Sequence, residues 1–188
     1  MAVQAGRHHF STDRNRIVLR TSRDGLAAQA GHDLTIEATR WSGELTVGDD
    51  QVPASVEVRV DMGALTVRTG TGGLKPLTDR DRREIGATAR KLLASDRNPE
   101  AVFTATKFEP DAAGGGLISG TFTLRGVERP LQLTVSQAGQ GRYHVTGSVL
   151  QSAYGIKPYT AFLGALKVRD QVEIEANIDL SEPAEAPA

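Results

Sequence analysis

The sequence lacks cysteine altogether, and it has no excess of charge of either sign. Without cysteine, a disulfide scaffold, a thiolate metal site and a cysteine nucleophile are all excluded. The 22 lysines and arginines nearly balance 23 aspartates and glutamates, so the formal net charge is −1. This balance gives no general electrostatic reason to bind nucleic acid or an anionic membrane surface. We therefore expect no nucleic-acid partner.

Long apolar runs are missing too. No segment approaches the roughly 20 apolar residues that span a bilayer, and residues 1–25 lack the apolar core of a secretory signal. We expect no membrane insertion and a cytoplasmic protein. The length of 188 residues suits one domain. We place it at residues 1–180, and we expect the Pro-, Ala- and Glu-rich segment 181–188 to be a disordered tail.

Motifs for metal or phosphate binding are also absent. The four histidines form no HxH or HExxH pattern, nor a grouping with carboxylates that would fix a metal geometry. The glycine clusters at 70–73 and 114–116 have neither the P-loop nor the dinucleotide-binding form. We expect no metal site, and we interpret both clusters as loops or turns.

What the chain does contain is alternation of apolar and polar residues with period two, typical of strands with one buried face. We predict about eight strands, near residues 17–21, 34–47, 56–62, 101–108, 117–124, 131–136, 143–150 and 171–180. Short connections favour an antiparallel meander, and eight strands can close into a barrel without exposed edges. The expected fold is mainly β, an antiparallel β-barrel.

One predicted strand changes phase partway along. Its apolar residues occupy even positions over 34–38 and odd positions over 45–47. Such a change indicates a bulge or a bend, and glycine eases it. We predict the bend at Ser42-Gly43, just after Trp41.

One segment has the period of a helix. Apolar residues recur at helical spacing at Ile85, Ala89, Leu92 and Leu93. Thr78 and Asp81 have the spacing of a capping box, which predicts an inserted amphipathic helix at about 79–94. The segment also carries the basic residues Arg80, Arg82, Arg83, Arg90 and Lys91. We interpret these as a solvated face, with a cationic patch for a phosphate or headgroup as the alternative.

His32 and Asp33 are adjacent, which raises the question of a reactive pair. Neighbours in a strand point to opposite faces, so their side chains do not naturally hydrogen-bond to each other. No suitably spaced nucleophile accompanies them. We interpret the pair as structural or ligand-contacting rather than as a general base.

The segment 152–168 is rich in large apolar residues and in glycine. Such a segment in a connection needs covering, either by core packing or by a ligand, and both interpretations stay open. Its large apolar residues are Tyr154, Ile156, Tyr159, Phe162, Leu163 and Leu166.

Four segments together resemble the YceI-like family. They are GHDLTIEATRWSGELTV, SVEVRVDMGALTV, ISGTFTLRGVERPLQLTVS and VLQSAYGIKPYTAFLGALKVRDQVEIEANIDL, and they occur in the family's order over residues 8 to 180. The GxxxLRGVxRPLxL pattern in the third segment is the most specific. Residues Gly31, His32 and Leu34 match the family's G-x-G-H-type strand start. Tyr154, Gly155 and Ile156 match its F-G-I element, with tyrosine in place of phenylalanine.

The resemblance implies a lipocalin-like barrel with an inserted helical segment, whose lumen holds a long polyisoprenoid or a similar amphiphile. It implies no shared catalytic constellation. We therefore predict binding, transport or storage of an isoprenoid-type lipid in the lumen, with no catalytic residue, no metal and no other cofactor, and a homodimer left open. The predicted ligand-binding residues are His32, Leu34, Ile36, Trp41, Phe122, Leu124, Leu133, Val145, Tyr154, Ile156, Tyr159, Phe162 and Leu163.

Two alternatives accompany this prediction. A shaped apolar cavity could catalyse cyclisation or isomerisation of a polyene by positioning alone, with His32, Tyr154 or Tyr159 as acid, base or hydrogen-bond donor. A barrel filled by its own side chains would instead act as a stress-related interaction module.

Overall fold

The computed structural model describes residues 3–181, and within them one twelve-stranded sheet, one α-helix and three short 3-10 helices. The strands are β1 (Gly6–Ser11), β2 (Arg16–Asp24), β3 (Asp33–Ala38), β4 (Trp41–Val47), β5 (Pro53–Asp61), β6 (Leu65–Thr71), β7 (Glu100–Pro110), β8 (Gly116–Leu124), β9 (Val127–Gly139), β10 (Arg142–Leu150), β11 (Thr160–Ala161) and β12 (Leu166–Asp179). The helices are η1 (Ala28–Ala30), α1 (Asp79–Leu93), η2 (Gln151–Tyr154) and η3 (Phe162–Gly164). The predicted tail lies outside the described residues, apart from Ser181.

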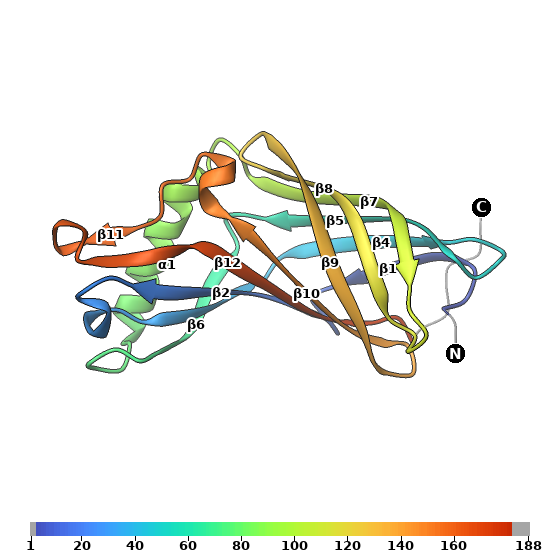
Figure 1. Ribbon diagram of the computed structural model, residues 1–188, viewed down its shortest axis with the longest axis horizontal. Coiled ribbons are helices and arrows are strands. Elements are labelled where there is room, and N and C mark those ends of the chain that lie inside the picture. Colours follow the sequence, from blue (N-terminus) through green and yellow to red (C-terminus); the bar gives the residue numbers. More distant parts are fainter. Residues whose placement is uncertain (1–2, 182–188) are drawn as a thin grey trace.

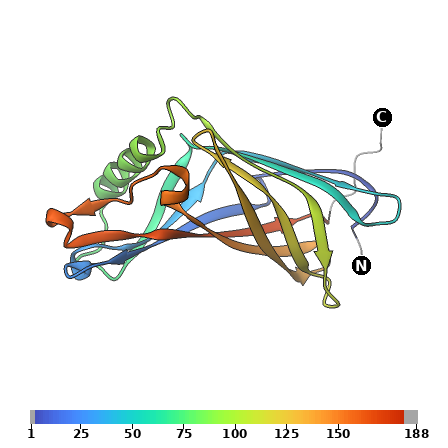
Figure 2. The ribbon, with the colours of Figure 1, turned by 45° about the horizontal axis from the view of Figure 1, so that its top comes forward.

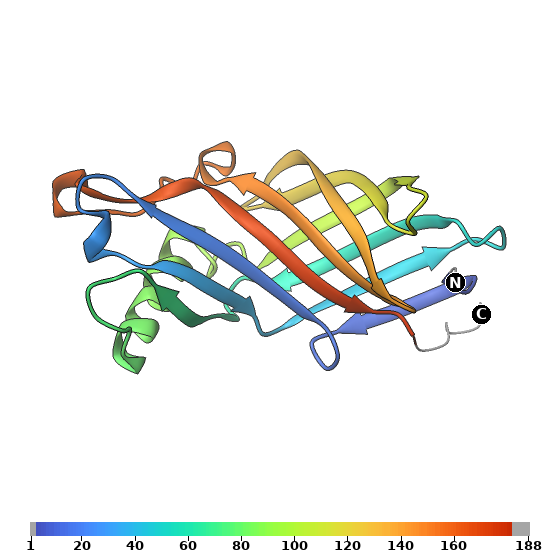
Figure 3. The same cartoon turned by 60° about the horizontal axis from the view of Figure 1, so that its bottom comes forward.

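The twelve strands form a single antiparallel sheet in the order β1-β4-β5-β7-β8-β9-β10-β12-β2-β3-β6, with β11 paired to β12. Strand β3 pairs with β2 and β6, and the strand that follows it, β4, pairs with β1 and β5. The continuous chain from β3 to β4 therefore joins the two ends of the hydrogen-bonded path, and the sheet curls into a barrel (Figures 1 and 3). The mainly β, lipocalin-like fold predicted from the sequence is confirmed.

The predicted number of about eight strands is too low. The pairs β1/β2, β3/β4 and β5/β6 are each one long segment that a bend or short turn divides in two. Strands β7, β8, β9, β10 and β12 run undivided, and β11 is a two-residue addition. The alternation therefore indicated the whole β3/β4 segment but only the β2 and β5 parts of the other two.

The bend in the β3/β4 segment lies at 39–40, before Trp41 and not at Ser42-Gly43 as predicted. The inward residues are Ala38 and then Trp41, Gly43 and Leu45, so the phase has already changed when β4 begins. Thr39 N–H donates to Ala64 O at 2.8 Å, which ties the bend to the adjoining bend of β5/β6. Gly43 occupies an inward position for another reason: a Cβ there would lie 2.2 Å from Cε2 of Phe10.

Strands β1 and β6 were not predicted. The segment before Phe10 looked unstructured, yet it pairs with β4 over six residues, from Gly6 opposite Val47 to Ser11 opposite Ser42. Within it, His8 is buried and its Nε2 lies 2.8 Å from Gln4 O. Short, polar-rich strands at the ends of a sheet carry too few apolar residues to show a pattern, because their stability comes from pairing with neighbours.

Helix α1 joins β6 to β7 and begins at the predicted residue. Thr78 is its N-cap: Asp81 N–H donates to Thr78 Oγ1 at 3.2 Å, and Thr78 N–H donates to Asp81 Oδ2 at 2.8 Å, which completes the capping box. The helix ends at Leu93, within one residue of the prediction, and Ala94 follows in a left-handed conformation with φ of 50°. Figures 1 and 2 show α1 at the end of the barrel that also carries β11.

The two most specific sequence motifs meet in space. Arg125 and Gly126 form the two-residue connection between β8 and β9, with φ of 53° and 74°, as a type I′ hairpin turn requires. The Arg125 guanidinium donates to Gly155 O at 2.6 Å. Gly155 is the C-cap of η2 and has φ of 67°. The hairpin therefore holds the connection after β10 against the barrel.

Candidate functional site

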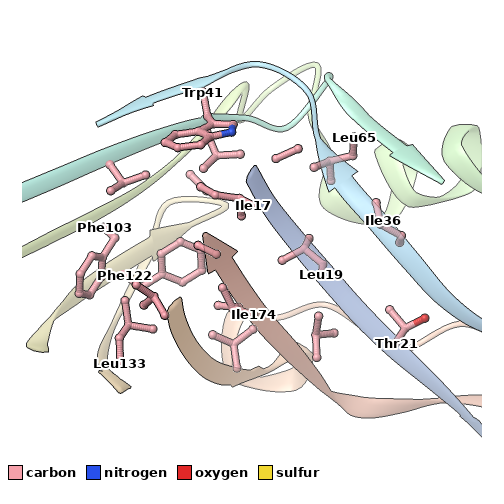
Figure 4. A pocket seen from close by; sticks show the side chains of 18 of the residues that line it. Ile17, Leu19, Thr21, Ile36, Trp41, Leu65, Phe103, Phe122, Leu133 and Ile174 are labelled. Atoms are coloured by element: carbon pink, nitrogen blue, oxygen red, sulfur yellow. The ribbon is translucent and has the colours of Figure 1, made fainter. Parts of the chain in front are cut away.

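A cavity of about 1110 Å³ runs through the barrel. Its lining extends from Leu117, Tyr143 and Leu180 near one end to Leu74 and Lys167 near the other. Figure 4 shows side chains from opposite walls pointing into it. The volume lies just above the usual range for small-molecule sites, roughly 300–1,000 Å³. The interior is therefore not filled by side chains, contrary to the alternative that needed a filled barrel.

The walls are apolar because the strands carry mainly apolar side chains at their inward positions. Leu19 and Ile36 enter from β2 and β3, Phe103 from β7, Leu133 from β9 and Ile174 from β12 (Figure 4). Helix α1 closes one side with its predicted apolar face, from Ile85 to Leu93. Ten of the predicted ligand-binding residues line the cavity: His32, Leu34, Ile36, Trp41, Phe122, Leu124, Leu133, Val145, Ile156 and Tyr159.

The other three predicted residues do not line the cavity. Tyr154 is buried behind its wall, with its ring edge-on to Phe122 at 5.6 Å between centroids. Burial raises the pKa of the Tyr154 hydroxyl, and the positive charge of Arg129 acts in the opposite direction. Phe162 and Leu163 lie in η3 with their side chains in solvent, 64% and 109% exposed. Segment 152–168 is thus core at one end and exposed surface at the other.

His32 and Asp33 have separate partners, as expected for neighbouring residues at the start of a strand. His32 Nε2 donates to Lys75 O at 2.7 Å, which ties the start of β3 to the loop before α1. Asp33 Oδ1 accepts from the Arg23 backbone N–H at 2.8 Å. His32 lines the cavity end while it holds this loop, and the two side chains do not form a catalytic pair.

Two polar atoms in the cavity wall have no hydrogen-bond partner among the described residues: Thr21 Oγ1 and Trp41 Nε1. Figure 4 places both side chains among those that line the cavity. A buried donor without a partner costs about 1–3 kcal/mol, so such groups are rare in a finished core. The sequence prediction named Trp41 as ligand-binding and missed Thr21. The inward phase of β2 could have identified it, since Thr21 shares that phase with Ile17 and Leu19.

The small inward residues serve two different purposes. Ala38 and Ala176 line the cavity and leave its space open. Gly147 instead lies under Leu133, whose Cδ2 would be 2.5 Å from an added Cβ. A Cβ at Gly120 would lie 2.2 Å from Thr104 O. These two glycines allow close packing within the wall.

The cavity lining includes a few titratable side chains, among them His32, Asp81, Glu84 and Tyr143. Among residues 3–181, no three His, Asp or Glu side chains come together to hold a metal ion. Burial raises the pKa of Tyr143, which lines the cavity, so the neutral phenol is favoured. No helix among the described residues has the length and apolarity to cross a bilayer.

Comparison with known proteins finds solved structures with a similar fold. The structure is similar to that of BcnA from Burkholderia cenocepacia, with a TM-score of 0.59 and 14% identity over 87% of this chain and 94% of that one. It is also similar to the YCEI protein of Campylobacter jejuni, with a TM-score of 0.51 and 14% identity over 77% and 84%. At these identities the likeness concerns the fold. A search of curated proteins finds no match.

The family itself follows from the sequence. Residues 17–180 match the YceI-like domain, which covers every strand from β2 to β12 and the whole cavity wall that they form. The chain therefore belongs to the YceI-like family.

Proposed function

We propose that this protein binds a long apolar amphiphile, such as a polyisoprenoid or an isoprenoid quinone, in its barrel cavity and carries or stores it without chemical change. The observation that supports this most directly is the cavity of about 1110 Å³ with a predominantly aliphatic and aromatic wall. Family membership supports the same ligand class. The cytoplasmic location predicted from the sequence is part of this proposal.

Burial of the ligand supplies enough free energy for this role. A chain ligand that buries several hundred Å² of apolar surface gains on the order of 10 kcal/mol, at about 25 cal/mol/Å², before the costs of association and ordering. Micromolar or tighter binding therefore needs no covalent chemistry. The shape of the cavity would select for length and flexibility of the chain.

Polar selectivity would come from the few hydrogen-bonding groups of the wall. Trp41 Nε1 is a donor and the Thr21 hydroxyl is both donor and acceptor, and neither has a partner among the described residues. A carbonyl oxygen on the ligand would satisfy Trp41. This favours a chain with an oxygen function over a pure hydrocarbon.

The catalytic alternative finds less support in the geometry. Its candidate acid, base or hydrogen-bond donor was His32, Tyr154 or Tyr159. Tyr154 does not line the cavity, the Nε2 of His32 is engaged with Lys75 O, and Tyr159 is exposed at the cavity end. Binding requires only the wall that is present.

The direct test is native mass spectrometry of protein purified without detergent from its own host, followed by addition of isoprenoid quinones and polyprenyl alcohols. We expect a mass increment that matches one lipid. A clean ligand-free mass before and after addition would refute the proposal.

A matched pair of variants locates the ligand. In Ile174→Trp, an indole enters the cavity from β12, and we expect affinity to fall about tenfold or more through steric exclusion. In Glu173→Trp, the same side chain is added at the neighbouring exposed position, and affinity should stay unchanged. Equal affinity of both variants for the lipid would place the ligand elsewhere.

A further inference from the structure

One end of the barrel carries an unusual concentration of exposed apolar side chains. Seven large hydrophobic residues are exposed among those that the structure describes, and five of them lie in three loops, 25–32, 72–77 and 158–165. We call these five the apolar rim: Leu26, Leu74, Tyr159, Phe162 and Leu163. Figures 1 and 3 show the three loops at the same end of the molecule, beside α1.

Hydrogen bonds hold the three loops together. Ala27 N–H donates to Ala165 O at 2.9 Å, which joins the first loop to the third. His32 Nε2 donates to Lys75 O at 2.7 Å, and the guanidinium of Arg23 donates to Gly72 O, so the second loop is fixed beside the first. The apolar rim is therefore a defined surface and not a set of unrelated loop tips.

The backbone conformation accounts for the exposure of two rim residues. Phe162 and Leu163 both have left-handed conformations, with φ of 50° and 54°, and Gly164 follows at 88°. Such conformations are uncommon for large non-glycine residues and persist only where the surrounding structure holds them. Here they direct two large apolar side chains outward. Leu26 and Leu163 are fully exposed, at 101% and 109%.

The rim is continuous with the cavity. Leu74 and Tyr159 belong to the rim and also line the cavity, together with Leu77 and Val168 just inside it. Lys75 and Lys167 line the same end, and neither makes an ion pair among the described residues. Apolar loop tips with free lysines beside them fit the boundary between lipid headgroups and acyl chains.

We propose that this end of the barrel docks on the surface of a phospholipid bilayer, with the apolar rim immersed at the headgroup boundary and Lys75 and Lys167 at the phosphates. A docked barrel would bring its cavity into contact with the acyl layer, so that a lipid passes between them without crossing water. The purpose of docking, passage of a lipid into the cavity, rests on the proposed function. The presence of the apolar rim does not depend on that function. Peripheral contact of this kind needs no membrane-spanning segment.

The test is co-sedimentation with vesicles of phosphatidylcholine, alone and mixed with phosphatidylglycerol. We expect the protein to bind the mixed vesicles more strongly, because anionic headgroups attract the two lysines. Replacing three rim residues that do not line the cavity, Leu26→Ser, Phe162→Ser and Leu163→Ser, should weaken binding about tenfold or more. The control is Val52→Ser with Leu150→Ser, two exposed apolar residues outside the rim loops, which should leave binding unchanged.

Two outcomes overturn the docking proposal: absence of vesicle binding by the unmodified protein, or equal binding by the rim and control variants. A concentration-dependent dimer that the rim substitutions dissociate, without vesicle binding, would show that a second copy covers the rim. Binding of a fluorescent polyprenyl probe added without vesicles tests the proposed function separately. Normal uptake of the probe by the rim variant, with loss of vesicle binding, supports docking specifically.

Discussion

Gly43 lies beneath the ring of Phe10, which reaches across from β1 to β4. Phe10 in turn packs edge-on to Trp41, with ring centroids 6.0 Å apart, at the cavity wall. Single residues of this kind decide how closely the wall packs. Glycine at position 43 makes room for a ring, and it does not mark the bend that the sequence suggested.

The substitution Gly43→Ala should therefore destabilise the protein. Its Cβ would overlap Phe10 and displace a packed ring, at a cost of about 1–3 kcal/mol in the free energy of unfolding, measured with denaturant. Ser42→Ala, at the neighbouring exposed position, should change stability by no more than about 0.5 kcal/mol. Equal stability of the two variants would contradict the packing argument.

Trp41 offers a second prediction at this scale. If its unpaired Nε1 binds a ligand oxygen, Trp41→Phe should reduce affinity for an isoprenoid quinone severalfold more than for a hydrocarbon polyene of similar length, since a net hydrogen bond contributes about 0.5–1.5 kcal/mol. Fluorescence or calorimetric titration gives the ratio. Phe103→Leu changes the lining without removing a donor and should leave that ratio unaltered.

At the scale of elements, helix α1 depends on its first turn. The Thr78 hydroxyl and backbone N–H both donate to Asp81, and these hydrogen bonds hold the pKa of the Asp81 carboxyl below its usual value. Since the helix forms one side of the cavity, its N-terminus affects the site as well as the stability. Thr78→Ala should lower the free energy of unfolding by about 1 kcal/mol.

The capping box also predicts a pH dependence. Because the folded-state pKa of Asp81 is lowered, its ionised form stabilises the fold above its unfolded-state pKa, and that contribution is lost as the pH falls through the folded-state pKa. The stability difference between the unmodified protein and Asp81→Ala should thus shrink on acidification. Asp96→Ala, an exposed aspartate beyond the helix, serves as control. A difference that is constant with pH would show that the carboxylate does not carry the effect.

The whole molecule is a barrel with an unfilled cavity, so its stability should depend on ligand binding. A ligand that binds only the folded state adds RT ln(1 + [L]/Kd), about 2.7 kcal/mol at a hundredfold excess over Kd. We expect the unfolding temperature of delipidated protein to rise on addition of polyprenyl lipid. In Ile174→Trp, a tenfold loss of affinity should reduce the stabilisation at the same lipid concentration to about half. A lipid-induced shift of equal size in that variant would argue against the cavity as the site.

Much of the fold could be predicted from local pattern. Alternation is a direct consequence of a sheet with one wet face, and the spacing from Thr78 to Leu93 reflects one turn of helix every 3.6 residues. Strands β1 and β6 were not predicted because they are short and stabilised by pairing with their neighbours. The position of the β3/β4 bend was three residues off, because an inward glycine can serve packing as well as bending.

The candidate site could be predicted in part. Ten of thirteen residues line the cavity. Those on strands could be predicted because inward phase follows from alternation, whereas Ile156 and Tyr159 were named for the apolar character of segment 152–168. Tyr154, Phe162 and Leu163 lie in a connection where no period indicates direction, and their places depend on η2, η3 and the left-handed backbone of 162–164. The unpaired state of Thr21 and Trp41 was also beyond prediction, because it depends on what surrounds each atom.

The sequence by itself determined a mainly β chain, one capped helix, the absence of cysteine chemistry and the family to which the protein belongs. These properties follow from residue type and short-range spacing. The tertiary structure decided that the interior is open and that three distant loops gather Leu26, Leu74 and Leu163 at one end. The net charge near zero had given no reason to expect binding to a membrane surface. Where side chains gather depends on strand pairing across more than a hundred residues, which no local pattern contains.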